Sequence, residues 1–556
     1  MLRSNYSGFR YSSALSVAFC VACLAFAGQY SPTSVFADET MSANLASRMG
    51  LETAWQRQIQ VPAGAASIVD QQIYVHQSEP HEYVEVVATM KRPDAETGKE
   101  ETYESVLRRI SVDEVDRYGN AIGKKEAERL ASNEVRRLTH RKVDAKVTSK
   151  TVPRICLYTL SDDGTLECRD AETGSPVWLS RVGNRHIGYS KIGIDDQFLT
   201  VINGGNLIKL NAKDGAELES IRTTTMPLFG AIHAGEYSMV PTIRNGIVGY
   251  PLSNDKREAF TEVVAGLALA PPSKSPNSTK IAWGTNRGYV YVMESEGTPS
   301  ILFRLNTDGI VSGRVAAASG DYFYFGSESG QVYGIQASRE GKVVWSRPYG
   351  EPFYNSPMIA GDKVLLRSTY GNLYCLGTAD GIMVWEDTVS NIDELLAVFD
   401  GKVFVRLLSG GLSVIDLESG KTISVTNDVL PTRLLANSQT NRLYLVSQTG
   451  AVQCLRPTGA VLPTFNESKS QSASSGSTDP MASDKEPEGP SGAFAGQGQP
   501  KDPFGASAAP AAAGGDPFGA GAADPFGAAG GDAMADPFGG GAGGGGADPF
   551  ADPFGN

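Results

Sequence analysis

A glycine-led unit recurs eight times along this chain of 556 residues. Each copy has a glycine, a short apolar run, a polar turn and a second run, as in GQVYGIQASREGKVVWS from residue 330. The leading glycines lie 41, 41, 42, 42, 41, 40 and 39 residues apart and are Gly164, Gly205, Gly246, Gly288, Gly330, Gly371, Gly411 and Gly450. So small a variation over seven intervals indicates one repeated supersecondary unit.

Each unit has the pattern of a small antiparallel sheet. One strand ends at the glycine, which is expected to adopt positive φ in a hairpin turn, and a second strand follows. A polar turn such as TADG precedes a third strand, which contains Trp178, Trp345 or Trp385 in three copies. A short run before each unit, such as NSPMIAG, supplies a fourth strand. Four strands in about 40 residues is the size of a propeller blade, so the sequence predicts an all-β propeller.

The two ends of the repeat region complement each other. The last unit, after Gly450, reaches AVLPTF without a tryptophan, whereas residues 50–61 (GLETAWQRQIQV) contain the missing Trp55. We therefore expect the early segment to pair with the last unit, which closes the ring and leaves no free sheet edge. This arrangement predicts an eight-bladed β-propeller over residues 38–465.

The repeat resembles the pyrroloquinoline-quinone-like (PQQ-like) propeller repeat family, whose blades carry the same pattern of G.vyaldaktG..lW. The resemblance covers roughly residues 50–90 and 150–460, and the layout of the whole chain is most similar to the family of the outer-membrane assembly factor BamB. It implies a scaffold that assists the assembly of outer-membrane proteins. Because this repeat serves enzymes as well as scaffolds, the fold alone does not decide the function.

The first 37 residues have the pattern of an export signal. Arg3 and Arg10 precede an apolar run at residues 14–28, and small residues surround a cleavage point after Ala37 or after Ala27. The run is shorter than the roughly 20 residues of a spanning helix, although an uncleaved anchor remains an alternative. We expect the mature protein to be exported to the periplasm or cell envelope.

Removal of the signal leaves four cysteines, Cys156, Cys168, Cys375 and Cys454, none of them in a Cys-x-x-Cys pair. This spacing excludes a zinc knuckle, a thioredoxin-like site and a c-type haem attachment. Cys156 and Cys168 flank the turn SDDG, so they either form a disulfide across a hairpin or are buried strand cysteines. Within the signal, Cys23 is a weak candidate for lipidation, because Cys20 stands where a leucine-like residue is needed.

An insertion at about residues 91–150 interrupts the first blade. Residues 101–115 place on one helical face Tyr103, Val106, Leu107 and Ile110. Residues 124–142 do the same with Ala127, Ala131, Val135 and Leu138. The turn RYGNAIG lies between them, so we expect a helical hairpin. Its second helix carries seven basic and three acidic residues, which form either a solvated face or a docking surface for an acidic partner.

From about residue 466 the chain consists mainly of Ser, Gly, Ala and Pro, a composition that cannot bury enough surface to fold. Residues 466–556 contain six Asp-Pro-Phe motifs, whose aromatic residues are Phe504, Phe518, Phe526, Phe538, Phe550 and Phe554. We expect a disordered tail that offers repeated weak contacts to a multivalent partner, or else a solvated spacer. Twelve acids and three lysines give the tail −9 of the net charge of −13, and this acidic balance argues against non-specific nucleic-acid binding.

No catalytic, cofactor-binding or metal-binding residue is predicted. As the resemblance implies, quinoprotein dehydrogenases of this fold need calcium, an aspartate base and commonly a disulfide between adjacent cysteines, and no adjacent cysteines follow the signal. The acidic turns SDDG, GIDDQ and NAKDG recur at loop positions and are interpreted as turn chemistry rather than calcium sites. The five histidines lack metal-ligand spacing, and His76 and His81 are expected to be exposed at a blade rim. No cofactor is therefore expected, with PQQ and calcium not excluded.

The leading hypothesis is a noncatalytic propeller scaffold that binds other envelope proteins, with peripheral membrane association left open. A PQQ-dependent quinoprotein dehydrogenase is the first alternative, and a bound cofactor spectrum with alcohol or sugar oxidation distinguishes it. A structural protein of the envelope or cell surface is the second, and it predicts abundance and self-association.

Overall fold

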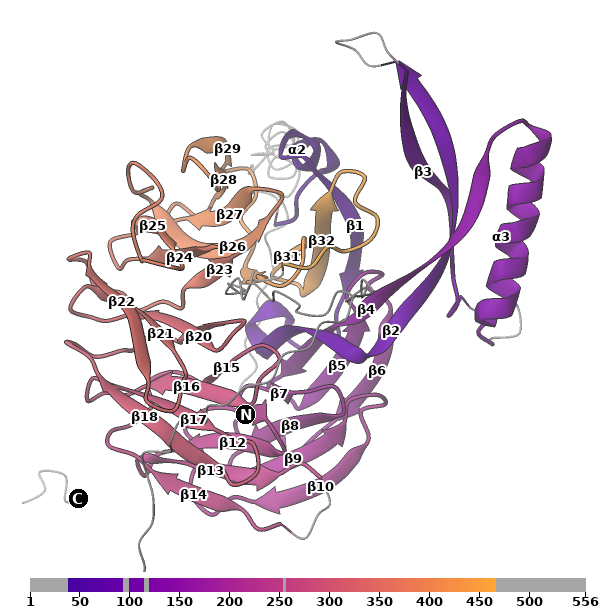
Figure 1. Cartoon of the computed structure of the whole chain (residues 1–556). Helices are drawn as coiled ribbons and strands as arrows, with labels where there is room; N and C mark the ends of the chain where they lie inside the picture. The colour runs from indigo at the N-terminus through magenta and orange to yellow at the C-terminus, as the bar shows by residue number, and fades with distance from the viewer. Residues whose placement is uncertain (1–38, 94–99, 115–119, 254–256, 467–556) are drawn as a thin grey trace, which may run out of the picture. The chain divides into compact units, whose positions relative to one another are not determined.

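The computed structural model describes residues 39–93, 100–114, 120–253 and 257–466. Within these residues the strands form eight antiparallel sheets, which are arranged around a ring (Figure 1). Seven of them have at least four strands, and the sheet that contains β23, β24 and β25 has three. The predicted all-β propeller fold is confirmed.

Each sheet contributes one strand to the inside of the ring and builds outward from it. The innermost strands are β2 (Ile68–Pro93), β7 (Gly193–Ile194), β11 (Ile232–Ala234), β15 (Ser273–Lys274), β19 (Ala316–Ala318), β23 (Met358–Ala360), β26 (Ile392–Phe399) and β30 (Arg433–Leu435). The second strands are β4 (Ala145–Ser161), β8 (Phe198–Asn203), β12 (Tyr237–Thr242), β16 (Lys280–Gly284), β20 (Tyr322–Gly326), β24 (Lys363–Arg367), β27 (Lys402–Leu407) and β31 (Leu443–Val446).

The third strands are β5 (Thr165–Asp170), β9 (Asn206–Asn211), β13 (Gly246–Pro251), β17 (Tyr289–Glu294), β21 (Gln331–Gln336), β25 (Leu373–Gly377), β28 (Leu412–Asp416) and β32 (Ala451–Pro457). The outer strands are β6 (Pro176–Arg181), β10 (Glu217–Arg222), β14 (Phe260–Val263), β18 (Ser300–Asn306), β22 (Lys342–Pro348), β29 (Thr422–Thr426) and β1 (Leu51–Gln58). The second and third strands are buried almost throughout, as in β8, whereas outer strands such as β10 are largely exposed. This gradient explains why the middle strands read as continuous apolar runs.

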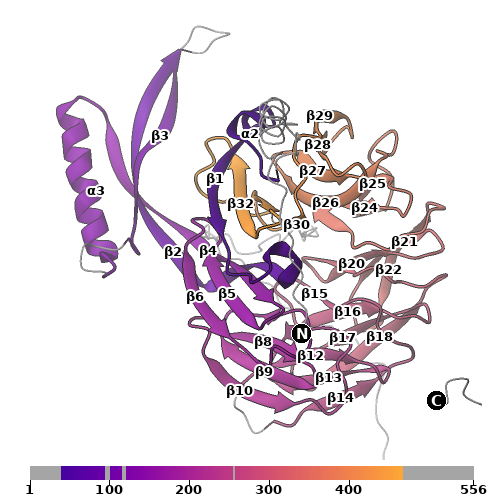
Figure 2. The same ribbon diagram turned by 180° about the vertical axis from the view of Figure 1, so that it is seen from behind.

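Neighbouring sheets contact each other around the whole ring. The innermost strands from β7 to β26 contact one another in succession. Hydrogen bonds complete the circuit, from Asn437 N to Leu396 O (2.7 Å), from Arg433 Nη1 to Ile68 O (2.6 Å) and from Ile192 N to Asp70 Oδ2 (2.9 Å). The ribbon seen from behind shows the same closed arrangement (Figure 2).

The ends of the repeat region pair as predicted. Strand β1 lies antiparallel to β32, with Trp55 opposite Cys454 and Leu51 opposite Pro457. A short helix before it, α2 (Ala43–Arg48), is capped by Ser42, and the 3₁₀ turn η1 (Gly64–Ser67) leads from β1 into β2. The early segment thereby completes the last sheet, and the closure prediction is confirmed.

In four of the sheets, one tryptophan side chain forms a hydrogen bond to the next sheet around the ring. The indole nitrogens donate to carbonyls of the following sheet, from Trp55 to Ala171 (2.8 Å), Trp178 to Ala212 (3.0 Å), Trp345 to Thr378 (2.8 Å) and Trp385 to Leu417 (2.9 Å). Each ring lies against a glycine with positive φ, and a Cβ on Gly174 would stand 2.6 Å from the ring of Trp55. The glycines in these contacts are not the leading ones but those of the polar turn after the third strand, Gly174, Gly215, Gly381 and Gly420, so this turn and the tryptophan form one contact between sheets.

The prediction for the leading glycines is partly wrong. Five of the eight have positive φ, but Gly205, Gly246 and Gly411 do not. In those units the preceding residue takes the left-handed conformation, as Asn245 does with a φ of 55°. Glycine and asparagine adopt positive φ more readily than most residues do. The hairpin turn is therefore retained, but its residue with positive φ lies one position before the leading glycine.

A buried ion pair also joins the last sheet to the first. Arg442, just before β31, has no exposed side-chain surface, and its Nη2 lies 2.6 Å from Oε2 of Glu172 in the turn after β5. Its Nε also donates to both oxygens of Glu172, at 3.1 and 3.2 Å. Around this pair, Trp55 and Tyr444 pack in one apolar cluster with Leu157 of the first sheet. Ring closure thus combines strand pairing, apolar burial and charge.

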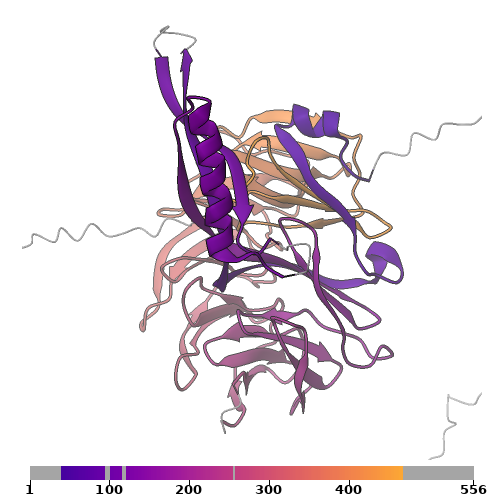
Figure 3. The ribbon, with the colours of Figure 1, turned by 90° about the vertical axis from the view of Figure 1, so that its right-hand side faces the viewer.

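The insertion differs from the predicted helical hairpin. Its second helix is confirmed as α3 (Gly123–His140), but the first predicted helix, at residues 101–115, is wrong, because the strand β3 (Glu100–Ser111) lies there instead. Strand β2 runs beyond the first blade and pairs with β3 on one edge and with β4 on the other (Figure 3). The insertion is therefore a three-stranded sheet with one helix on it.

A β-bulge explains this error. Val86 pairs with Arg108 and Val87 pairs with Val106, so Leu107 is an extra residue in β3. The bulge interrupts the alternation of apolar and polar residues that identifies a strand, and it leaves a spacing that fits a helix. The β-branched residues of β3 and the apolar run on β2 favour a strand, and this tertiary pairing decides the outcome.

Candidate interaction surfaces

The projecting module, as we call residues 81–152, stands beside the ring on the extended strands β2 and β4 (Figures 1 and 3). It has its own apolar core, in which Ala127 and Ala131 of α3 pack against Val84, Val86 and Ile110 of the sheet. All but Ile110, which is 2% exposed, have no exposed surface. A separate core of this kind gives the module stability that does not depend on packing within the ring.

One face of α3 is basic and exposed. At 100° per residue, the direction opposite the buried alanines is occupied by Lys125, Arg129, Arg136 and His140, which we call the basic row. Within it, Arg129 pairs with Glu126, whereas Lys125 and Arg136 have no ion pair among the described residues. Other cations of the helix are neutralised, since Lys124 pairs with Glu82 and Arg137 with Glu134. The face that is turned away from the sheet therefore keeps a net positive charge.

His81 connects the module to the first sheet of the ring. Its Nδ1 lies 2.7 Å from Oδ2 of Asp113 in the module, and its Nε2 lies 3.5 Å from Oδ2 of Asp170 at the end of β5. Asp170 first and Asp113 second raise the pKa of His81 above its ordinary value, although burial opposes them. A protonated His81 is therefore attracted to carboxylates on both sides of the junction.

The junction is expected to weaken as the pH rises. Because the pKa of His81 is higher in the folded state, its stabilisation is complete below the unfolded value of about 6.5 and is lost as the pH rises through the folded value. Hydrogen exchange at Val112, whose amide donates to Glu82 O (2.9 Å), should accelerate as the pH rises above about 6.5, beyond the intrinsic effect of pH. His81→Gln should remove this extra dependence, and an unchanged profile in that variant would contradict the assignment.

The ring is expected to fold without the module. Glu82 and Thr151 are paired across β2 and β4, so an Asn-Gly turn can replace residues 83–150 without moving the strand ends. The unfolding free energy of the ring should then change by no more than about 1 kcal/mol, as measured by calorimetry. A large loss of thermal stability would show that the module belongs to the core of the ring.

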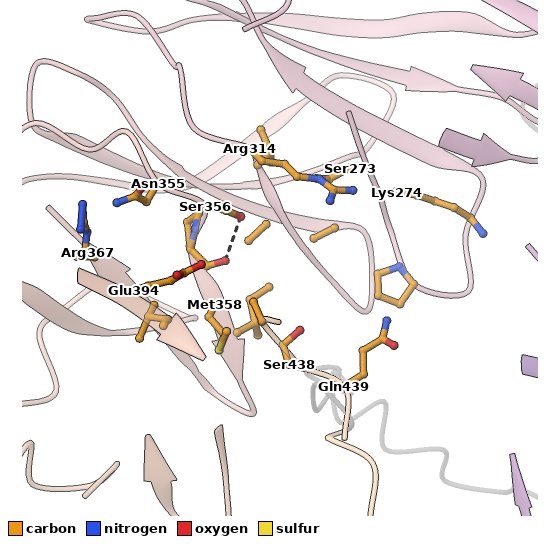
Figure 4. Close-up of a pocket in the computed structure, with 18 of the residues that line it drawn as sticks. Ser273, Lys274, Arg314, Asn355, Ser356, Met358, Arg367, Glu394, Ser438 and Gln439 are labelled. Atoms are coloured by element: carbon orange, nitrogen blue, oxygen red, sulfur yellow. Dashed lines mark hydrogen bonds between the residues drawn. The ribbon is translucent and has the colours of Figure 1, made fainter. Parts of the chain in front are cut away.

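A cavity of about 740 Å³ lies on the inside of the ring. Side chains from β15, β19, β23 and β26 line it, together with Ala436, Ser438 and Gln439 after β30 (Figure 4). A second cavity of about 620 Å³ shares Glu394 and Arg406 with it. The inner strands are only two or three residues long in β15, β19 and β23 and carry small side chains such as Ser273 and Ala316, which leave this space open.

The acids of the cavity are already paired. Arg406 places Nε 2.6 Å from Oδ2 of Asp393 and Nη2 3.1 Å from Oε2 of Glu394. Arg367 lies 3.6 Å from the other oxygen of Asp393. Burial, only partly offset by Arg406, raises the pKa of Glu394. Two carboxylates held by two arginines are a poor calcium site, so this donor set does not fit the ion that quinoprotein dehydrogenases need.

The structure tests the other expectations from the sequence. Cys156, Cys168, Cys375 and Cys454 are all free and buried, so the alternative of buried strand cysteines is confirmed over the disulfide. The acidic turns are confirmed as turn chemistry, because Asp195 accepts from the amides of Gln197 (2.7 Å) and Phe198 (2.6 Å).

The expectation of an exposed His76 is wrong. Its side chain is buried and its Nε2 lies 2.9 Å from the hydroxyl of Tyr158, because the long strand β2 carries it inside the first sheet. His81 is only partly exposed, at the base of the projecting module. Among the described residues, no group of three or more His, Cys, Asp or Glu is placed to hold a metal ion.

The predicted site residues of the tail, Phe504, Phe518, Phe526, Phe538, Phe550 and Phe554, lie outside the described residues, as does the export signal. Over the part of the chain that is described, no helix is long and apolar enough to cross a membrane. Sequence reasoning missed the cavity. In the sequence, the one feature that could have indicated the cavity was the presence of three cations, Lys274, Arg314 and Arg406, in or near short strands of the repeat.

A comparison with known protein families finds a match within the repeat region. Residues 276–433 match the model of a family described as outer membrane protein assembly factor BamB. No curated protein matches the chain. Among solved structures, BamB from Moraxella catarrhalis is 20% identical with a TM-score of 0.44, over 54% of this chain and 91% of that chain.

Two further solved structures match this chain over a similar share of its length. Sqt1 from Saccharomyces cerevisiae is 10% identical with a TM-score of 0.42, over 54% of this chain and 92% of that chain. The computationally designed protein Ika8 is 14% identical with a TM-score of 0.43, over the same shares of the two chains. Residues 276–433 of the repeat region are therefore similar to the family described as outer membrane protein assembly factor BamB.

Proposed function

We propose that this protein is a noncatalytic scaffold, exported to the cell envelope, that holds other envelope proteins through its projecting module. The observation that carries the proposal is the basic row on α3, an exposed charged face on a module with its own core. The contact of the helix with its sheet does not require unpaired cations on the outer side. A partner with an acidic surface gives them a role, since complementary charge speeds association and selects partners.

The match to the family model supports a location for the partner. The model that fits residues 276–433 is described as an outer membrane protein assembly factor, and the first 37 residues have the pattern of an export signal. Both favour a partner in the envelope. Assistance to outer-membrane protein assembly is the process that this similarity suggests.

A pull-down from envelope fractions tests the proposal. The bait is the full chain, and the variant reverses three charges of the basic row as Lys125→Glu, Arg129→Glu and Arg136→Glu. The matched control reverses Arg222 and Lys342, which are exposed on outer strands of the ring. Partners should be lost from the first variant and retained by the control. Equal capture by all three chains, or binding to anionic vesicles in place of protein, would contradict a protein partner for the basic row.

The alternative enzyme is tested in the same preparation. Addition of PQQ and calcium should give neither a bound cofactor spectrum nor oxidation of alcohols or sugars. The appearance of both would establish a quinoprotein dehydrogenase instead. A structural protein of the envelope would be recognised by self-association of the purified chain without a partner.

The Asp-Pro-Phe tail is expected to add weak, repeated contacts. Each phenylalanine can bury apolar area worth roughly 1.5–3 kcal/mol if fully enclosed, and several motifs on one linker raise avidity. Changing Phe504, Phe518, Phe526, Phe538, Phe550 and Phe554 to serine should abolish a tail-dependent interaction and leave the melting temperature unchanged. An identical envelope pull-down before and after the change would make the tail a spacer.

A further inference from the structure

The cavity inside the ring has cations that its own acids do not neutralise. Asp393 and Glu394 are committed to Arg406 and Arg367, as described above. Lys274 and Arg314 also line the cavity, from β15 and from the segment before β19 (Figure 4). The lining therefore holds four cations and two carboxylates, an excess of two positive charges.

Arg314 is held in place by neutral groups. Its Nε donates to Oγ of Ser273 (2.9 Å) and its Nη2 donates to the carbonyl of Pro272 (3.2 Å). These two bonds fix the guanidinium and leave Nη1 without a protein partner among the described residues. Surrounding protein lowers the pKa of Arg314, an effect that the charge of Asp70 opposes. Water reaches the side chain from the cavity, so a fixed and incompletely neutralised cation faces an accessible space.

Lys274 supplies a second free charge. Its side chain is exposed, and no hydrogen bond or ion pair joins its ammonium group to the rest of the described chain. Lys274 follows Ser273 in β15, and Lys274, Ser273 and Arg314 all line the cavity. A carboxylate that enters the cavity would meet a fixed planar donor and a flexible point charge, a combination suited to oxyanions.

The remaining lining indicates what kind of anion fits. Asn355, Ser356, Ser438 and Gln439 offer donors and acceptors for a peptide backbone, and Met358 and Leu395 offer apolar contact. The cavity is much larger than a single inorganic anion needs and has the size of typical ligand sites. No aromatic side chain lines it, so nothing there would stack a nucleotide base.

We propose that this cavity is a binding site for an acidic peptide segment, with a carboxylate held by Arg314 and Lys274. The inference deepens the proposed scaffold function by adding a second, internal site for protein segments. The cavity site does not depend on the projecting module. If the cavity binds no acidic peptide, the proposal that the basic row binds a partner is unaffected.

Isothermal titration calorimetry on the full chain tests the site. The probe is the peptide Gly-Asp-Ala-Asp-Ala-Asp-Gly, and its matched control has asparagine at the three acidic positions. The acidic probe should bind, and Lys274→Gln and Arg314→Gln should each weaken it about tenfold or more, with Lys342→Gln on the outer strand β22 as the control variant. Repetition with the chain ended at Asn466 removes competition from the twelve acids that follow.

Three results would overturn the proposal. Equal binding of the asparagine peptide would show that no carboxylate is recognised. Unchanged affinity in Lys274→Gln and in a folded Arg314→Gln would place the probe elsewhere. Binding of inorganic phosphate as tight as that of the peptide would mean that the cavity takes small anions rather than peptide segments.

Discussion

Deletion of residues 39–61 is expected to leave no stable folded monomer. The deleted segment contributes the whole outer strand of the last sheet and buries Leu51, Trp55 and Ile59 to 6% exposure or less. Burial of three such side chains is worth about 5–9 kcal/mol at about 1.5–3 kcal/mol each, which is comparable to the entire stability of many proteins. The loss also exposes the edge of β32, a template for association.

Circular dichroism and size-exclusion chromatography measure this result directly. The deletion should give aggregates or loss of the cooperative unfolding transition. The control is a chain ended at Asn466, which loses many more residues but no described contact of the ring, and it should melt as the full chain does. A deletion variant that remains monomeric and melts normally would mean that β1 does not hold the ring closed.

Arg442→Ala is expected to destabilise the ring by about 3 kcal/mol, because it removes a fully buried cation and leaves Glu172, whose side chain is only 19% exposed, without its partner. The carboxylate already has a raised pKa, caused first by burial and opposed by Arg442. Loss of the arginine also removes the bonds that it makes to Asn441 Oδ1 (2.8 Å) and to Glu172. Chemical denaturation of the variant should show a large fall in the midpoint.

Arg456→Ala is the matched control for this substitution. Arg456 also pairs with a glutamate in the last sheet, at 2.7 Å from Glu52, but the two side chains are 24% and 36% exposed. Its removal should cost about 0–1 kcal/mol. The double variant Arg442→Met with Glu172→Leu should recover part of the loss, since an apolar pair leaves no buried charge. Equal effects of the two alanine variants would contradict a special role for the buried pair.

The periodic part of the fold could be predicted because the repeat acts through local rules. Glycines about 41 residues apart locate the turns, and Trp55 identifies the segment that completes the last sheet. The partner of each tryptophan could not be read from the sequence. Its ring packs on the glycine of the following sheet, such as Gly174, which is a contact between sheets rather than within one.

The insertion could be predicted only in part. Helix α3 has a regular apolar face over one continuous segment, and periodicity identifies such a helix. Strand β3 depends on pairing with β2, and the bulge at Leu107 conceals its alternation, so a local pattern favours the wrong structure. The cavity was missed for a related reason. Its lining comes from five sheets that lie far apart in sequence, and no motif joins Lys274 to Arg406.

Site-specific photo-crosslinking tests the scaffold function most directly. A photoreactive amino acid replaces Arg136 in the basic row of the full chain, and the same amino acid replaces Arg222 on an outer strand as the control. Irradiation of cells that express the chain should give a discrete crosslinked envelope protein from position 136 and none from position 222. The crosslink should disappear when Lys125 and Arg129 are changed to glutamate. The absence of a discrete product at position 136, or the same product from both positions, would contradict the proposal that the projecting module holds a protein partner.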